Sequence, residues 1–375
     1  MAPVAEILGS YDPLFVAVPN ALSDILDAHG GGASAAVFVD GEPVVDVWGG
    51  GADPERSIPW QQDTITNVWS VTKTVTVLCA LVLADRGELD LDAPVARYWP
   101  EFAAAGKERV LVRHVLSHTA GLPFPDRPTT AEDSYDWDEI TARLAAQAPE
   151  WEPGTAAGYH SLTQGFLIGE VIRRITGGSV GEFLSAEIAG PLVADFHIGL
   201  AAAHDHRVAP SLPPPGQSED FTASAPGTAA SGADVGGIRV RDGNTTAWRR
   251  AQIPAGSGYG NARSVALLQS VMACGGSVRG NRLLTTATRD RALEIQYRGP
   301  DRVLGMQMAW ALGFGAFGRT FGWGGWGGSL VVFEPDSRMA VAYVTNRMLD
   351  PAAGPDSRGM DLVMASYDGL STLSR

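Results

Sequence analysis

The sequence predicts an α/β protein of the α+β type, in which an antiparallel β-sheet flanked by helices is formed by both ends of the chain and a helical domain is inserted between them. Two observations predict this arrangement. β-rich runs occur near both ends, and segments of helical periodicity fill the middle, from about residue 90 to 200. The 375 residues allow about two domains at roughly 150 residues each. We therefore expect an α/β sheet domain from residues 1–85 and 236–375 and a mainly helical domain with a long connecting loop from residues 86–235.

The first elements are expected to be a helix and a hairpin. Apolar residues at helical spacing predict a helix over residues 15–30. The dipeptide Asp40-Gly41 separates two β-rich runs, Ala35–Val39 and Val44–Trp48. Asp-Gly between such runs is a strong signal for a β-hairpin, so the sheet is expected to begin near the N-terminus.

A nearly continuous run of apolar or small residues, Val71 to Ala84, predicts a helix that is buried on all sides. Gly87 fits the position after the end of this helix. Further helices, separated by Pro-Gly and Gly-Gly breaks, are expected near 113–117, 137–148, 162–176 and 180–188.

The rest of the chain is expected to return to the sheet. Residues 201–235 are rich in Ala, Pro, Gly and Ser, and they form either a long surface loop or a crossing between domains. Helices are then expected over 262–274 and 357–373. The strands between these helices are expected near 307–314, 319–325, 328–334 and 339–346.

The composition excludes several classes of function. The chain has 42 Asp and Glu against 28 Lys and Arg, a net charge of −14, which argues against binding to nucleic acid or to an anionic membrane. Residues 1–20 lack the pattern of a signal peptide, and no apolar run approaches the ~20 residues of a membrane span, so we expect a soluble, cytoplasmic protein. Two cysteines cannot form a disulfide framework or a four-ligand zinc site. Neither metal-ligand spacing nor a phosphate-binding loop is found, so we expect no metal and no cofactor.

Ser70 and Lys73 form the first candidate site. Only two of the 28 basic residues are Lys, at positions 73 and 107, so a Lys in this Arg-rich chain calls for a chemical reason. Residues three apart lie on one helix face, which brings the Lys73 amine within reach of the Ser70 hydroxyl. Burial lowers the pKa of a lysine, and a lysine without its proton can accept one from Ser, which Arg cannot do. The alternative is that Ser70 caps the helix and Lys73 extends to the surface.

The run Gly177-Gly178-Ser179-Val180-Gly181 matches the Gly-x-Ser-x-Gly pattern of α/β-hydrolases. That pattern requires a strand before the serine, whereas here a helix is expected on both sides. Ser179 and Glu182 have the spacing of a capping box at a helix start. We therefore predict a structural role for this motif.

Three sequence segments, the first of which matches the Ser-x-x-Lys motif of the family, together resemble the serine β-lactamase and penicillin-binding-protein superfamily. They are Ser70-Val71-Thr72-Lys73, Arg86-Gly87-Glu88-Leu89-Asp90-Leu91-Asp92 and Leu116-Ser117-His118-Thr119-Ala120-Gly121-Leu122. More closely, the chain resembles the class C β-lactamase-like carboxylesterases, the family VIII esterases, from about residue 15 to 370. The resemblance implies that Ser70 is the nucleophile and Lys73 its general base.

The second motif of the family, Tyr-x-Asn, matches Tyr159-His160-Ser161. The resemblance implies that Tyr159 shares the general-base role with Lys73, and a phenol beside a cation can have its pKa lowered. From the residues alone, Tyr159 fits equally well as a boundary aromatic. Ser161 stands in place of the Asn, and this departure favours an esterase over a lactamase.

The third motif, Lys-Thr-Gly in lactamases, matches Trp323-Gly324-Gly325, which Trp326 follows. The resemblance implies an oxyanion hole formed by the N–H groups of Ser70 and Trp326, and a Trp323 that replaces the cation for the β-lactam carboxylate. Paired glycines allow a close approach of the backbone to a substrate. Because Trp326-Gly327-Gly328 repeats the pattern, the register is open by three residues, and a tight Trp-rich hairpin is the alternative.

Three more polar residues have a structural and a functional interpretation. His118 is expected to hold the 116–122 loop, and His160 either is structural or tunes the neighbouring Tyr159. Arg347, after Asn346 at the end of the last expected strand, is expected to form a structural ion pair, the alternative being a substitute cation for the substrate.

The expected function is that of a serine carboxylesterase, which hydrolyses short-chain or small apolar esters through an acyl-enzyme on Ser70. A small-molecule ester is the expected partner. One alternative is a β-lactamase or a D-amino-acid peptidase or amidase that uses the same Ser/Lys/Tyr site. Another is a non-catalytic module that binds β-lactam-like ligands.

Overall fold

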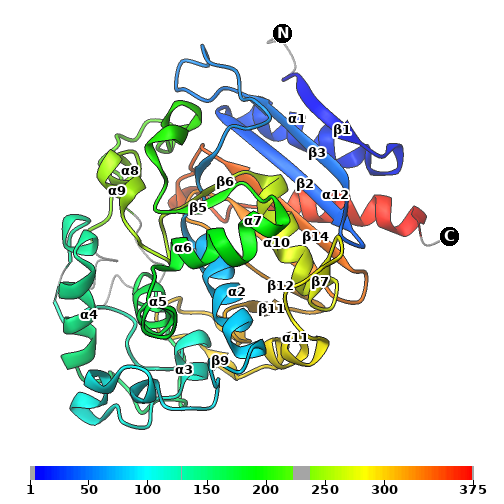
Figure 1. Ribbon diagram of the computed structural model, residues 1–375. Coiled ribbons are helices and arrows are strands. Elements are labelled where there is room, and N and C mark those ends of the chain that lie inside the picture. Colours follow the sequence, from blue (N-terminus) through cyan, green and yellow to red (C-terminus); the bar gives the residue numbers. More distant parts are fainter. Residues whose placement is uncertain (1–4, 128, 223–236, 374–375) are drawn as a thin grey trace.

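The computed structural model describes residues 5–127, 129–222 and 237–373 (Figure 1). Within these residues, nine strands form one antiparallel sheet in the order β1-β3-β2-β14-β13-β12-β11-β10-β9. Strands β2 and β14 pair along their lengths, so the N-terminal and C-terminal parts of the chain meet inside this sheet, as predicted. The strands are β1 Ile7–Tyr11, β2 Gly32–Val39, β3 Glu42–Gly50, β9 Tyr297–Pro300, β10 Gln307–Trp310, β11 Gly315–Phe317, β12 Thr320–Gly324, β13 Leu330–Glu334 and β14 Met339–Thr345.

Helices cover both faces of the sheet (Figure 1). The apolar sequence of β14 shows why, because alternate side chains of a strand point to opposite faces. Val341 and Tyr343 join the core with α1 and α12, whereas Ala342 and Val344 join the larger core with α10 and α2. The helices are α1 Ala17–His29, α2 Thr72–Asp85, α10 Ala262–Ala273 and α12 Arg358–Leu373.

The helical part of the chain packs beside α2, with α5 and α6 in direct contact with it. The predicted helix over 180–188 consists of α6 and a π-helical turn, Ser185–Ala189. The predicted capping box is confirmed, because Ser179 Oγ accepts the Glu182 N–H at 3.2 Å and the Glu182 carboxylate accepts the Ser179 N–H at 2.8 Å. These helices are α3 Val112–Leu116, α4 Trp137–Ala146, α5 Thr163–Thr176 and α6 Val180–Leu184.

Several short elements could not be predicted, because segments of two to eight residues carry little or no periodicity. One group forms a second sheet, of order β4-β6-β5, from β4 Thr66–Asn67, β5 Phe196–Ile198 and β6 Gly258–Gly260. The others are β7 Ser277–Val278, β8 Asn281–Arg282, α7 Gly190–Leu192, α8 Val240–Gly243, α9 Thr246–Arg250 and α11 Thr286–Leu293. No helix in the described ranges has both the length and the apolar character that a membrane crossing requires.

The sequence-based boundaries are partly confirmed. Asp40 and Gly41 both have positive φ, 53° and 82°, as the turn of the predicted hairpin requires. The predicted strand over 307–314 is confirmed only for its first half, β10, because the chain then turns at Gly313 (φ 82°) and begins the separate strand β11. Of the connection over 201–235, the described part contains a 3₁₀ turn, Ala202–Arg207, and residues 223–235 lie outside the described ranges.

Candidate active site

Ser70 lies in the 3₁₀ turn that leads into α2, directly after a strained residue. Trp69 has φ 49°, a conformation that bulky residues rarely adopt. Its ring packs between Trp326 and Trp248, with ring centroids 4.7 and 5.6 Å away, and its N–H donates to Asn67 Oδ1 at 3.2 Å. These contacts hold the backbone turn that presents the Ser70 hydroxyl.

Lys73 is buried and its amine reaches Ser70. The side chain is 1% exposed, Nζ lies 2.9 Å from Ser70 Oγ, and Nζ donates to the Ala255 carbonyl at 2.9 Å. No carboxylate of the described residues lies within ion-pair distance of this amine. Burial therefore lowers the pKa of Lys73 well below its usual value, and the predicted geometry of the Ser-Lys pair is present. The carbonyl of Ala255 carries no signal in the sequence.

Tyr159 completes the group around Ser70. Its hydroxyl hydrogen-bonds with Ser70 and accepts the indole N–H of Trp323 at 2.9 Å, and the Lys73 amine lies 4.9 Å from its ring centroid. The expectation of a lowered phenol pKa is wrong. Burial raises the pKa of Tyr159 to about 12, and the neighbouring amine gives little compensation because burial also favours its uncharged form.

The backbone that carries Tyr159 is held by His118. The His118 carbonyl accepts the N–H of Gly158 at 3.0 Å, and His118 Nδ1 accepts the N–H of His160 at 3.0 Å. His160 in turn donates from Nδ1 to the Gly158 carbonyl at 2.6 Å and accepts the Leu122 N–H at Nε2. Burial lowers the pKa of His160 to about 4. Both neutral rings therefore connect the 116–122 loop to the segment of Tyr159.

The two Trp-Gly-Gly motifs take different places. Trp323-Gly324 ends β12, whereas Trp326-Gly327-Gly328 forms the turn before β13. The Gly325 N–H is used by the Ser329 carbonyl at 2.7 Å, and the Gly328 N–H donates to the Gly325 carbonyl at 3.1 Å. A Cβ on Gly325 would lie 2.2 Å from the Val68 carbonyl oxygen. The end of β12 thus contacts the backbone just before Ser70, and because Gly325 is already paired, the next candidate donor is the Trp326 N–H.

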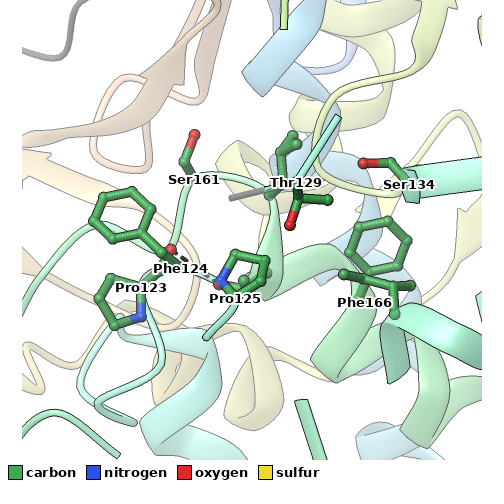
Figure 2. Close-up of a pocket in the computed structure, with 10 residues that line it drawn as sticks. Pro123, Phe124, Pro125, Thr129, Ser134, Ser161 and Phe166 are labelled. Atoms are coloured by element: carbon green, nitrogen blue, oxygen red, sulfur yellow. Dashed lines mark hydrogen bonds between the residues drawn. The ribbon is translucent and has the colours of Figure 1, made fainter. Parts of the chain in front are cut away.

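Ser70 lines a small, mainly apolar pocket. Trp323 is not among the residues that line it, whereas Trp326 is. Ser161 lines this pocket and also an adjoining one (Figure 2). Around the second pocket Figure 2 shows Phe124 and Pro125 on one side and Phe166 on the other. The lining of the first pocket consists of Trp69, Ser70, Ser161, Leu162, Ile238, Trp248, Gly256 and Trp326, none of which is charged.

Arg347 does not form the predicted ion pair. Its guanidinium donates to the Pro213 carbonyl at 2.7 Å, and no carboxylate of the described residues pairs with it. It lines neither pocket near Ser70. The prediction failed because the residues that follow β14 lie beside the irregular segment at Leu212, whose carbonyl groups need donors.

The sheet, the buried Ser-Lys pair and the adjoining tyrosine define the class of β-lactamase-like serine proteins. The chain belongs to the beta-lactamase family, whose model matches residues 20–364. It is 36% identical to "Esterase/beta-lactamase LipL" of Mycobacterium tuberculosis, over 94% of this chain and 86% of that protein. It is 28% identical to "Esterase EstB" of Burkholderia gladioli, over 86% and 88%. A crystal structure of a family VIII carboxylesterase, 38% identical, superposes with a TM-score of 0.89 over 97% of this chain and 100% of that one.

Proposed function

We propose that this protein is a serine carboxylesterase that hydrolyses short-chain or small apolar esters through an acyl-enzyme on Ser70. The observation that carries the proposal is the buried Lys73 amine, 2.9 Å from Ser70 Oγ and without a carboxylate partner in the described structure. Similarity to proteins named esterases, LipL, EstB and a family VIII carboxylesterase, supports the substrate class.

The proposed reaction has two halves. Ser70 Oγ attacks the ester carbonyl carbon while its proton passes to neutral Lys73 Nζ. The N–H groups of Ser70 and Trp326 stabilise the oxyanion. When the carbon–oxygen bond to the alcohol breaks, the Tyr159 hydroxyl donates its proton to the leaving oxygen and regains one from Lys73. In the second half, water attacks the acyl-enzyme by the same proton route in reverse and releases the acid.

The uncharged pocket favours esters over β-lactams. A penicillin carries a carboxylate, and burying a charge without a partner is costly. None of the residues that line the pocket at Ser70 offers a cation, and Trp323 is hydrogen-bonded to Tyr159. A D-amino-acid amide would bring an ammonium group into the same apolar surroundings. The presence of Ser70, Lys73 and Tyr159 together argues against a module that only binds ligands.

The test is a series of p-nitrophenyl esters of increasing acyl length, assayed beside nitrocefin. We expect a burst of p-nitrophenol, a mass increase of one acyl group on a peptide that contains Ser70, and kcat/KM for acetate or butyrate far above that for nitrocefin. Ser70→Ala should abolish both the burst and the adduct. Full activity of Ser70→Ala would refute the proposal, and a higher kcat/KM for nitrocefin would reassign the substrate class.

Two coarser features are also proposals. We propose that residues 1–85 with 236–375, and residues 86–235, are the two structural divisions of the chain, supported by the sheet strands at both ends and the helices between them. We propose a cytoplasmic location, with which the buried free thiols of Cys79 and Cys274 are compatible.

A further inference from the structure

Asp301 is a buried carboxylate with no ion-pair partner among the described residues. It lies in the loop between β9 and β10 and is 1% exposed. Its Oδ1 accepts the N–H groups of Tyr159 at 3.0 Å, Val303 at 3.0 Å and Leu304 at 2.9 Å. Its Oδ2 accepts the indole N–H of Trp310 at 3.0 Å. Four donors explain how a charge is tolerated here.

The loop of Asp301 docks onto the segment of Tyr159. Beside the carboxylate contact, the Arg302 N–H donates to the Ala157 carbonyl at 2.9 Å, and the two segments form a parallel bridge. The loop itself is closed by the Asp301 N–H, which donates to the Met306 carbonyl at 2.9 Å. Two neighbouring attachments therefore fix the backbone from which Tyr159 extends.

Asp301 also fixes the ring that covers Tyr159. The Trp310 indole, held by Asp301 Oδ2, lies parallel to the Tyr159 ring with centroids 6.1 Å apart and planes 8° apart. Trp310 also meets His118 edge-on at 4.4 Å. One carboxylate thus holds the backbone of Tyr159 on one side and its stacking partner on the other.

We propose that Asp301 is a positioning residue for the reaction, which holds Tyr159 in register with Ser70. The inference rests on the proposed function, in which the Tyr159 hydroxyl relays a proton. A misplacement of a reacting group by about 1 Å can lower a rate about 10²-fold. The effect of losing Asp301 should therefore appear in kcat and should depend on the Tyr159 hydroxyl.

The charge of Asp301 also supports the role of Tyr159, because it favours the protonated form of the Tyr159 hydroxyl. The titratable groups around the Tyr159 ring are Lys73 from α2, His118 and His160 from the neighbouring loops, and Asp301. Burial lowers the pKa of Lys73, His118 and His160, which favours their uncharged forms. Burial raises the pKa of the Tyr159 phenol, and the nearby carboxylate of Asp301 adds to this effect, so both help to keep the hydroxyl proton that the relay needs.

The first experiment is Asp301→Asn, with kinetics on p-nitrophenyl acetate. The amide oxygen can still accept the three backbone N–H groups, but the amide N–H₂ faces the indole N–H of Trp310. We expect kcat to fall about tenfold with KM changed less than twofold. Trp310→Phe removes the opposing donor, so the double variant Asp301→Asn/Trp310→Phe should recover part of the kcat lost in Asp301→Asn. Recovery also keeps the test valid if Asp301→Asn alone folds poorly.

The second experiment is a double-mutant cycle with Tyr159→Phe. If Asp301 acts through the Tyr159 hydroxyl, Asp301→Asn should lower kcat by less than twofold in the Tyr159→Phe background. Equal fold losses in both backgrounds would overturn the proposal. The activated ester p-nitrophenyl acetate keeps the residual turnover of Tyr159→Phe measurable.

Glu170 supplies a matched control. It is also a buried carboxylate that accepts a Trp indole N–H, from Trp137 at 2.7 Å, but it pairs with Arg173 and Arg174 and lies on α5 outside the pockets at Ser70. Glu170→Gln should lower thermal stability and leave kcat within twofold of the wild type. If the wild type hydrolyses no ester, the proposed function fails. If it is active and the cycle is additive, only the role of Asp301 fails.

Discussion

The indole N–H of Trp323 donates a hydrogen bond to the hydroxyl of Tyr159 at 2.9 Å. We propose, from the family resemblance, that Trp323 takes the place of the Lys in the third motif and that Tyr159 is the Tyr of the second. Two motifs that lie 164 residues apart are therefore joined directly. The Ser70 side chain is a further hydrogen-bond partner of this hydroxyl, so the two motifs meet beside the candidate nucleophile.

Trp323→Phe should remove this donor and keep the ring. A single hydrogen bond is worth about 0.5–1.5 kcal/mol, so we expect kcat for p-nitrophenyl acetate to fall by roughly two- to tenfold. KM should change little, because Trp323 does not line the pocket at Ser70. Steady-state kinetics separate the two constants, and a rise in KM alone would contradict this assignment.

Lys73→Arg should abolish activity although it keeps a positive side chain. An arginine stays charged at any working pH, so it cannot accept the Ser70 proton, and general-base catalysis is worth about 10²–10⁴-fold. We expect kcat to fall by at least about 10²-fold, measured by the release of p-nitrophenol. A kcat of Lys73→Arg near that of the wild type would show that another group acts as the base.

The pH dependence follows from the uncharged amine. The active form has neutral Lys73, so kcat/KM should rise with pH through the lysine pKa and level off well below 10.5, its ordinary value. Burial raises the pKa of Tyr159 to about 12. At pH values below about 10 the phenol therefore keeps its proton, and we expect no decrease of kcat/KM from its ionisation. A pH–rate profile, corrected for spontaneous hydrolysis of the ester, tests both the rise that we assign to Lys73 and the absence of a fall from Tyr159. A rate that is still rising at pH 10 would contradict a neutral lysine.

Gly325→Ala should damage the site through the backbone. The added Cβ would lie 2.2 Å from the Val68 carbonyl oxygen, so the end of β12 and the turn of Ser70 must separate. The loss of one oxyanion donor costs about 10²–10³ in kcat, and we expect a loss of that order. Gly324→Ala is the comparison, because its Cβ would be 3.6 Å from the nearest atom, and its effect should be much smaller. Equal losses of kcat in Gly325→Ala and Gly324→Ala would contradict the importance of the close contact between Gly325 and the Val68 carbonyl.

Lys107, the second lysine, should matter for stability alone. It is fully buried, and its Nζ donates to the carbonyls of Ala104 and Ala145 at 2.9 Å and to that of Gln147. Lys107→Met leaves three carbonyls without this donor, so we expect the free energy of unfolding to fall by about 2–4 kcal/mol in a urea titration. The exposed Arg109→Met is the matched control, with a change below about 0.5 kcal/mol. An unchanged stability of Lys107→Met would contradict this account.

The sequence predicted correctly those features that depend on residues close to one another along the chain. The Asp40-Gly41 turn, the buried helix α2 and the Ser70–Lys73 pair depend on neighbours within a few residues, and each is found in the structure. The direction of the Tyr159 pKa was predicted wrongly, because it depends on whether Lys73 keeps its charge in a low-dielectric interior. That depends on the whole fold around the amine.

Long-range contacts escaped prediction for a different reason. Asp301 is 142 residues from Tyr159, and the Ala255 carbonyl is 182 residues from Lys73. An acidic residue in a loop has no local pattern that distinguishes it from a solvated one, and a carbonyl group belongs to every residue. The short strands of the second sheet were missed because they are defined by their partners alone.

The pairing of β2 with β14 has a consequence for folding during synthesis on the ribosome. A ribosome finishes residues 32–39 about 300 residues before it makes their partner at 339–345. During that time the apolar strand β2 has no partner on one edge. Pairing between segments that are far apart in the sequence slows folding, and an unpaired strand edge promotes aggregation. A chain that ends between residues 159 and 338 would already contain Ser70, Lys73 and Tyr159, yet it would lack β14, the strand that joins the two ends of the chain in the sheet.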